Sequence, residues 1–290
     1  MKASVAKKLD SFWLLCTTAL RKFIADDGLF LASALAFNLL LYFIPLSLLM
    51  ISLLGYTVLD SERAMHEVQS VLKAFLPRSQ QALADNLSAI VADRGLLGFV
   101  GFASFFLFST FLFGSVRTVL NRVFQVKQER RLAERMRVDL LMMGLTALLV
   151  LLAVGTTWFL TMALAFTERY PSWGGLLQPG LVALSKALGV AATVLLLYVL
   201  YRFPPAATMS ARALVIASVT GTVLFQFAKF GFAWYVAGAQ ANIELYGTLG
   251  GLMYLFIWLY YASVVFVLGA EVGWAYDQPR EPASVRERGL

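Results

Sequence analysis

The chain contains a stretch of 32 consecutive residues, Gly28–Leu59, that carries no charged side chain. At about 1.5 Å per residue, a helix of this length exceeds a hydrocarbon core of roughly 30 Å. The stretch is therefore predicted to be a transmembrane helix, which places the chain in a lipid bilayer. Asn38 and Pro45 lie inside it, and neither residue type suits an inert anchor.

The composition of the whole chain leads to the same conclusion. Hydrophobic residues make up 60 % of it and charged residues 14 %, whereas soluble domains carry about 25 % charged residues. The chain has too few polar side chains to cover a globular surface. One cysteine, Cys16, excludes an intramolecular disulfide and a cysteine-rich metal cluster.

Charge-poor stretches predict an all-α polytopic membrane protein with six transmembrane helices. Together they form a membrane domain over residues 28–277, followed by a tail at 278–290. Two of the spans become long enough only when a flanking or internal lysine is included. The predicted spans cover residues 29–58, 95–116, 139–166, 181–201, 211–236 and 246–275.

Three stretches outside the spans are amphipathic. Residues 1–27 repeat apolar side chains every three or four positions between basic ones, which predicts a helix in the cytoplasmic interface. Residues 61–93 contain two such stripes separated by Pro77, which predicts a helical hairpin on the outer face. Residues 117–137 alternate basic and apolar side chains and form a cytoplasmic connection. Most of the 24 Lys and Arg residues lie on the side of the N-terminus, this connection and the tail, so both termini are predicted to be cytoplasmic.

Four polar or helix-bending residues inside spans are candidates for a substrate path. Pro45 removes a backbone hydrogen bond, and Asn38 lies two helical turns before it on nearly the same face. Their alternative role is an interhelical hydrogen bond and a packing kink. Lys229 and its helical neighbour Gln226 would meet an anionic headgroup if they face inward; the alternative is a lysine that snorkels to the interface.

The last span carries a different pattern. Gly269 and Gly273 are four residues apart and allow another helix to approach closely. Glu271 lies between them and needs a partner at the cytoplasmic boundary, for which Arg117 and Arg122 lie at the expected depth. An ion pair is the favoured interpretation, and a role in coupling or gating is the alternative.

The basic connection is a candidate site for lipid headgroups, because apolar residues alternate with its charges. Four arginines carry this prediction: Arg130, Arg131, Arg135 and Arg137.

Enzymatic chemistry finds no support in the sequence. A single histidine, His66, cannot form a metal site or a catalytic triad by itself. No glycine-rich phosphate-binding loop occurs. We therefore expect no catalytic residues, no metal and no cofactor.

Several short motifs, in their order and spacing, resemble the YihY/BrkB family of bacterial inner-membrane proteins. The similarity covers roughly residues 20–277 and implies six helices in a bacterial inner membrane. The family once carried the label ribonuclease BN, and other proposals link it to resistance to host killing and to lipid movement across the inner membrane. The motifs are Ala34-Leu35-Ala36-Phe37 with Ile44-Pro45, Leu120-Asn121-Arg122, Tyr201 with Pro204-Pro205, Tyr246-Gly247, Trp258, and Gly269-Ala270-Glu271.

These observations favour an envelope protein that binds or translocates an anionic lipid or a related amphiphile. The expected partners are membrane lipids with anionic headgroups, and no nucleic acid. The second hypothesis is a membrane scaffold or assembly factor that acts through a protein partner or a second copy of itself. The third and weakest is a membrane-tethered ribonuclease, for which the sequence offers no nuclease site.

Overall fold

The protein is described by a computed structural model. It describes residues 2–58, 94–127, 131, 133–146, 148–149, 171–207, 209–238 and 248–278. The predicted outer hairpin at 61–93, Arg130, His66, residues 151–166 of the third expected span, residues 246–247 of the sixth and nearly all of the tail lie outside the described residues.

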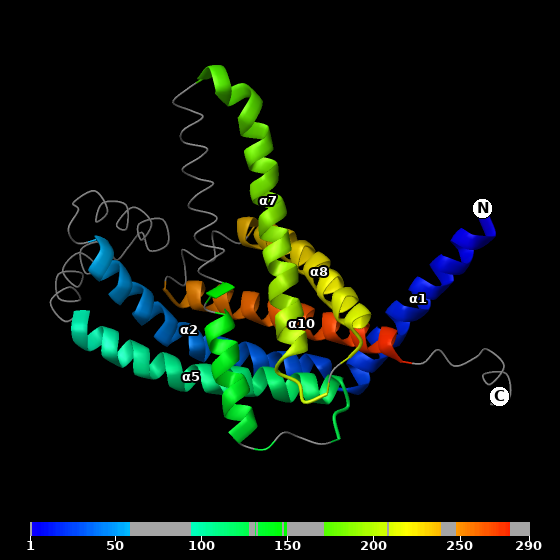
Figure 1. Cartoon of the computed structure of the whole chain (residues 1–290), viewed down its shortest axis with the longest axis horizontal. Helices are drawn as coiled ribbons and strands as arrows, with labels where there is room; N and C mark the ends of the chain where they lie inside the picture. The colour runs from blue at the N-terminus through cyan, green and yellow to red at the C-terminus, as the bar shows by residue number, and fades with distance from the viewer. Residues whose placement is uncertain are drawn as a thin grey trace. The chain divides into compact units, whose positions relative to one another are not determined.

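Within the described ranges all regular secondary structure is helical, which confirms the predicted all-α fold class. Figure 1 labels six long helices in chain order. Their bounds are α1 (Lys2–Ala25), α2 (Gly28–Val58), α5 (Arg94–Val123), α7 (Pro171–Arg202), α8 (Ala211–Gly238) and α10 (Thr248–Asp277). A further helical stretch covers residues 133–146.

Among the residues that the structure describes, five helices are long and apolar enough to cross a bilayer: α2, α5, α7, α8 and α10. They correspond to the first, second, fourth, fifth and sixth expected spans. The third expected span begins in the helical stretch at 133–146 and continues into residues outside the described part, so six spans stay a prediction. The second span was predicted to end at residue 116. In the structure, α5 continues to Val123 and includes Arg117 and Arg122.

The chain divides into two compact units, which are described separately. Unit 1 comprises Met1–Leu31, Val116–Phe227 and Val264–Leu290, and unit 2 comprises Ala32–Ser115 and Ala228–Ser263. Unit 1 contains α1, the end of α5, α7, the first part of α8 and the end of α10. Unit 2 contains most of α2 and α5, the end of α8 and the first part of α10.

In unit 1, α8 and α10 approach each other through small residues. A methyl group added at Gly269 would lie 2.6 Å from the Tyr201 hydroxyl and 3.0 Å from the Gly221 Cα atom. One added at Gly273 would lie 2.7 Å from the Ala217 Cβ atom. Because lipid tails are as apolar as leucine side chains, close backbone packing of this kind takes the place of the hydrophobic effect between helices in a membrane.

Tyr201, near the end of α7, packs against this contact between α8 and α10. Its side chain is fully buried, and its hydroxyl donates a 2.8 Å hydrogen bond to the Phe266 backbone carbonyl on α10. The two rings lie 5.0 Å apart between centroids. Tyr201 therefore links α7 to the α8–α10 pair by both polar and aromatic contact.

In unit 2, aromatic pairs join the helices, and Asn38 of α2 donates a hydrogen bond to the Ser115 hydroxyl of α5. Tyr42 of α2 lies 5.2 Å from Phe105 of α5, measured between ring centroids, and Phe232 of α8 lies 5.1 Å from Trp258 of α10. Such tilted aromatic pairs contribute about 0.5–1.5 kcal/mol beyond the area they bury. They connect α2 with α5 and α8 with α10.

We expect Gly269→Ala to lower the stability of the protein in mixed micelles by about 1–3 kcal/mol, because the added methyl group forces α8 and α10 apart. Gly251→Ala on the same helix is the matched control, since nothing lies within 4 Å of a methyl group at that position. Denaturant titration of both variants measures the difference. Equal stability of the two variants would show that the close approach does not hold the helices together.

Candidate functional site

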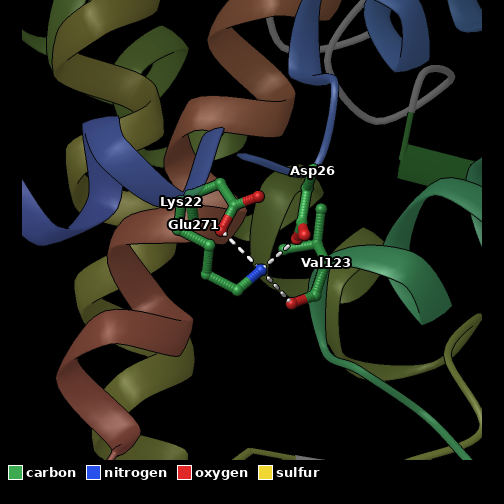
Figure 2. Close-up of polar contacts among 4 residues, drawn as sticks. All are labelled: Lys22, Asp26, Val123 and Glu271. Carbon is green, nitrogen blue, oxygen red and sulfur yellow. Dashed lines mark hydrogen bonds and ion pairs between the residues drawn. The ribbon is translucent and has the colours of Figure 1, made fainter. Parts of the chain in front are cut away.

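A buried lysine joins three segments of unit 1. The Lys22 ammonium forms an ion pair with Glu271 of α10 at 2.9 Å and donates a 2.8 Å hydrogen bond to the Val123 carbonyl of α5. It also pairs with Asp26, one turn further along the chain. Figure 2 shows these three acceptors around the Lys22 nitrogen atom. We call Lys22, Asp26, Val123, Glu271 and Trp274 the Lys22 cluster.

Local backbone structure places Lys22 in this position. It lies in the last turn of α1, and a two-residue turn at Asp26 and Asp27 leads directly into α2. Asp27 adopts a left-handed conformation with φ of 57°, and its carbonyl accepts hydrogen bonds from Phe30 at 2.8 Å and Leu31 at 3.0 Å. Asp tolerates this conformation better than most residues. The turn fixes the end of α1 against the start of α2.

The end of α5 supplies an acceptor. Gln125 has φ of 52° and its N–H donates to the Arg122 carbonyl at 3.1 Å, while the Val126 N–H donates to the Asn121 carbonyl at 2.9 Å. This hydrogen-bond pattern terminates a helix and leaves the last carbonyls partly unsatisfied. Lys22 satisfies the Val123 carbonyl, and its positive charge lies at the negative end of the α5 dipole.

The cluster is almost completely removed from solvent. Side-chain exposure is 8 % for Lys22, 16 % for Asp26 and 0 % for Glu271. The Trp274 ring lies 4.4 Å from the Lys22 nitrogen, at a distance where a cation is attracted to an aromatic face. Within the described part of the chain, the Glu271 Oε1 atom has no hydrogen-bond partner. Removing Lys22 leaves the Glu271 carboxylate buried and uncompensated, whereas removing the Glu271 charge leaves Lys22 paired with Asp26.

The predicted partners of Glu271 were wrong. Arg117 instead forms an ion pair with Asp139, just after the basic connection, and Arg122 is exposed. Arg117 and Arg122 lie at other angular positions around the α5 axis. The end of α1 instead brings Lys22 to Glu271 of α10. Sequence reasoning counted Lys22 among the cytoplasmic surface charges. Its spacing from the buried residues Ala19 and Phe23 was the available signal that it lies on the packed face of α1.

Several residues that carry the family resemblance lie near the same helix ends. The Asn121 side-chain oxygen accepts a 3.0 Å hydrogen bond from the Ala206 N–H, which ties the end of α5 to the segment after α7. Pro204 and Pro205 in that segment are fully buried. These contacts explain structurally why Asn121 and the proline pair occur where they do.

The start of α8 is fixed to the end of α10. The Ser210 hydroxyl accepts a 3.3 Å hydrogen bond from the Ala213 N–H and thereby caps α8. Asp277, at the last position of α10, accepts hydrogen bonds from the Ser210 N–H at 3.2 and 3.3 Å. The Asp277 carboxylate lies at the positive end of the α8 dipole. A pocket of about 620 Å³ lies here and is lined by Ser210, Ala211, Arg212, Tyr276 and Asp277.

Asn38 makes the interhelical contact that was one of its two predicted roles. Its side-chain amide donates to the Ser115 hydroxyl of α5 at 3.2 Å and to the Ala34 carbonyl of its own helix at 2.9 Å. Pro45 is buried, and α2 continues through it to Val58. Gln226 is half-buried on α8, and Lys229 is exposed on the same helix. A substrate path along these four residues stays a prediction.

Of the four arginines predicted to meet lipid headgroups, Arg131 and Arg137 are exposed and Arg135 is half-buried. The Arg135 N–H donates to the Arg131 carbonyl at 3.0 Å, so this part of the connection is helical as expected. Among the residues described, no group of three His, Cys, Asp or Glu side chains could hold a metal ion.

The long apolar helices and the buried polar contacts between them define a polytopic α-helical membrane protein. The chain belongs to the BrkB family, since residues 19–289 match the family described as Virulence factor BrkB. This match confirms the resemblance that the sequence motifs indicate.

Relatives with similar sequences are described as membrane proteins. The chain is 25 % identical to a UPF0761 membrane protein of Pseudoalteromonas atlantica over 80 % of its length and 77 % of the relative. It is 24 % identical to one of Aliivibrio fischeri over 94 % of its length and 86 % of the relative. It is 26 % identical to one of Prosthecochloris aestuarii over 87 % of its length and 58 % of the relative. No solved structure matches the chain.

A double-mutant cycle tests the pairing of Lys22 with Glu271. We expect Lys22→Met to lower stability in mixed micelles by about 3–5 kcal/mol, and Glu271→Gln to lower it by less, because Lys22 keeps its pair with Asp26. The double variant is expected to lose less than the sum by more than about 1 kcal/mol, because the buried carboxylate that Lys22→Met alone leaves without a partner is no longer charged. Arg117→Met combined with Glu271→Gln is the control cycle and should be additive within about 0.5 kcal/mol. Coupling at Arg117 and not at Lys22 would contradict the pairing seen in the structure.

Proposed function

We propose that this chain is an inner-membrane protein, with both termini in the cytoplasm, that binds or translocates an anionic lipid or a related amphiphile without covalent chemistry. The observation that carries the proposal is a set of exposed basic side chains around the joined helix ends of unit 1. We call this set the basic rim: Arg21, Arg122, Lys127, Arg131, Arg137 and Arg212.

Contacts between helix ends support the grouping of these residues. Lys22 joins the end of α1 to the ends of α5 and α10, and the Arg117–Asp139 pair joins the helical stretch at 133–146 to α5. Ser210 and Asp277 join the start of α8 to the end of α10. The basic rim therefore surrounds one end of unit 1.

The rim carries an excess of positive charge. The exposed acidic residues of unit 1 in the described ranges are Asp27, Glu134 and Asp277, and Asp277 is engaged with Ser210. A cytoplasmic leaflet with anionic lipids attracts each nearby Lys or Arg by about 1 kcal/mol. Basic residues also concentrate on the cytoplasmic side of membrane proteins. Both arguments favour a rim that faces the cytoplasmic leaflet and gathers anionic headgroups.

The pocket beside Ser210 supports the same proposal. It combines the guanidinium of Arg212 and the exposed Tyr276 ring with the small side chain of Ala211. A cationic group beside an aromatic and an apolar surface suits the boundary between a headgroup and its acyl chains. We propose that Lys229 meets the headgroup on the outer side and that Asn38 and Pro45 shape an intramembrane groove.

Removing charge from the basic rim should weaken binding of anionic lipid. We expect the variant Arg122→Gln, Arg131→Gln, Arg137→Gln to bind short-chain phosphatidylglycerol roughly 100-fold less tightly, since three contributions of about 1 kcal/mol are lost. Lipid-dependent shifts of the melting temperature in detergent measure the affinity. Short-chain phosphatidylcholine should shift neither protein.

A single-charge comparison controls for net charge. Arg137→Gln should weaken binding, whereas Lys186→Gln, an equal change of charge at an exposed position of α7 outside the rim, should leave it unchanged. Equal loss in the two variants would assign the effect to net charge. Unchanged binding in both the Arg137→Gln and the triple variant would reject the rim as a lipid site.

Translocation is tested with purified protein in liposomes that contain a fluorescent phosphatidylglycerol. We expect faster loss of inner-leaflet label to an outside quencher than in empty liposomes, and slower loss with Lys229→Ala. Rates equal to those of empty liposomes would restrict the proposal to binding. Equal rates together with a reproducible cross-linked partner would favour the scaffold hypothesis.

A further inference from the structure

The charges of the Lys22 cluster do not balance. Two carboxylates, Asp26 and Glu271, face one ammonium group in a site that is largely removed from water. Burial of an uncompensated charge costs far more than burial of a neutral polar group. The Glu271 Oε1 atom is fully buried and has no hydrogen-bond partner among the described residues.

The two carboxylates differ in what they connect. Asp26 lies four residues after Lys22 on the same α1 segment, so that pair adds nothing between helices. Glu271 lies on α10, so its pair with Lys22 crosses between elements. Loss of the charge on Glu271 removes an interhelical link, and loss of the charge on Asp26 does not.

We propose that the Lys22 cluster binds a proton at Glu271 and that this proton controls the docking of α1 on α10. A proton from bulk water forms an O–H bond at Glu271 Oε1, and the attraction between opposite charges across the two helices is lost. Lys22 keeps its ion pair with Asp26 in the turn directly after α1. The remaining links of Lys22 to other helices are the Val123 hydrogen bond and the Trp274 ring.

In the described structure, few groups around Glu271 can compensate the charge of its carboxylate. The charged groups that face it in the described structure are Lys22, in the last turn of α1, and Asp26, in the turn directly after α1. From α5 the cluster receives the Val123 carbonyl, and α8 presents Ala213 and Ala217 to the neighbouring turn of α10. Asp26 is partly exposed, so the cluster reaches solvent on the α1 side. This inference is independent of the lipid proposal.

The experiment uses Cys16, which is the one cysteine of the chain and lies on α1. The full-length protein is labelled there with a nitroxide and placed in nanodiscs of phosphatidylcholine, which carry no net charge. We expect an immobilised label at pH 8 and a mobile fraction that rises reversibly as the pH falls toward 5. Glu271→Gln should show the mobile label across this range, with the docking equilibrium shifted roughly 100-fold or more.

Asp26→Asn is the matched control, because it removes the same charge beside the same ammonium group but leaves the interhelical pair. It should keep the acid transition of the unchanged protein. The double variant Lys22→Met, Glu271→Gln removes both charges of the interhelical pair, leaves only the partly exposed Asp26, and serves if Glu271→Gln alone does not fold. It should show no pH response.

Four outcomes would overturn the proposal. Three of them are a label in Glu271→Gln that behaves as in the unchanged protein, an acid transition that persists in the double variant, and an unchanged protein that shows no transition between pH 8 and 5. Loss of the transition in Asp26→Asn alone would assign the proton to Asp26 and also reject the proposal for Glu271.

Discussion

The described structure of unit 1 depends on a single ammonium group that satisfies acceptors from three segments. In a bilayer the hydrophobic effect does not bring helices together, so close backbone packing and interhelical polar contacts must do so. Lys22 donates to a helix-terminal carbonyl, pairs with a buried carboxylate and contacts an aromatic ring. A lysine can do this because it carries three donors on a flexible stem. The end of α1 thereby becomes part of the membrane domain's core and not only an interfacial appendage.

The same end of unit 1 combines two kinds of polar residue with different consequences. Inward-facing polar groups such as Asn121 and Tyr201 bind backbone groups, so their roles are satisfied within the chain. Outward-facing basic groups such as Arg131 and Arg137 are exposed. Exposed positive charge at a membrane boundary is free to attract headgroups, whereas buried hydrogen-bonded groups are not. This distinction places the lipid proposal on the rim and not on the buried cluster.

The helices could be predicted from the sequence because the membrane imposes a length and an apolar composition on each span. The bounds of α2 follow closely from a charge-free run, and α8 matches its predicted span once Lys229 is included, whereas α5 extends beyond its run to include Arg117 and Arg122. A helix continues past the bilayer as long as its ends can be capped, and the cap at Gln125 depends on backbone geometry that no charge pattern reveals. The spacing of Gly269 and Gly273 indicates a close contact, but it does not name Ala217 and Gly221 as the facing residues.

The partner of Glu271 could not be derived in the same way, and the reason is physical. Depth in the membrane can be estimated along the chain, but the direction in which each helix faces depends on all its contacts at once. Arg117 pairs with Asp139, while Lys22, in the last turn of α1, pairs with Glu271. A basic residue in an interfacial helix is usually read as a surface charge. Lys22, however, shares a helix face with the buried side chains of Ala19 and Phe23. A basic residue on such a face is better predicted to be buried and to pair with the nearest buried carboxylate.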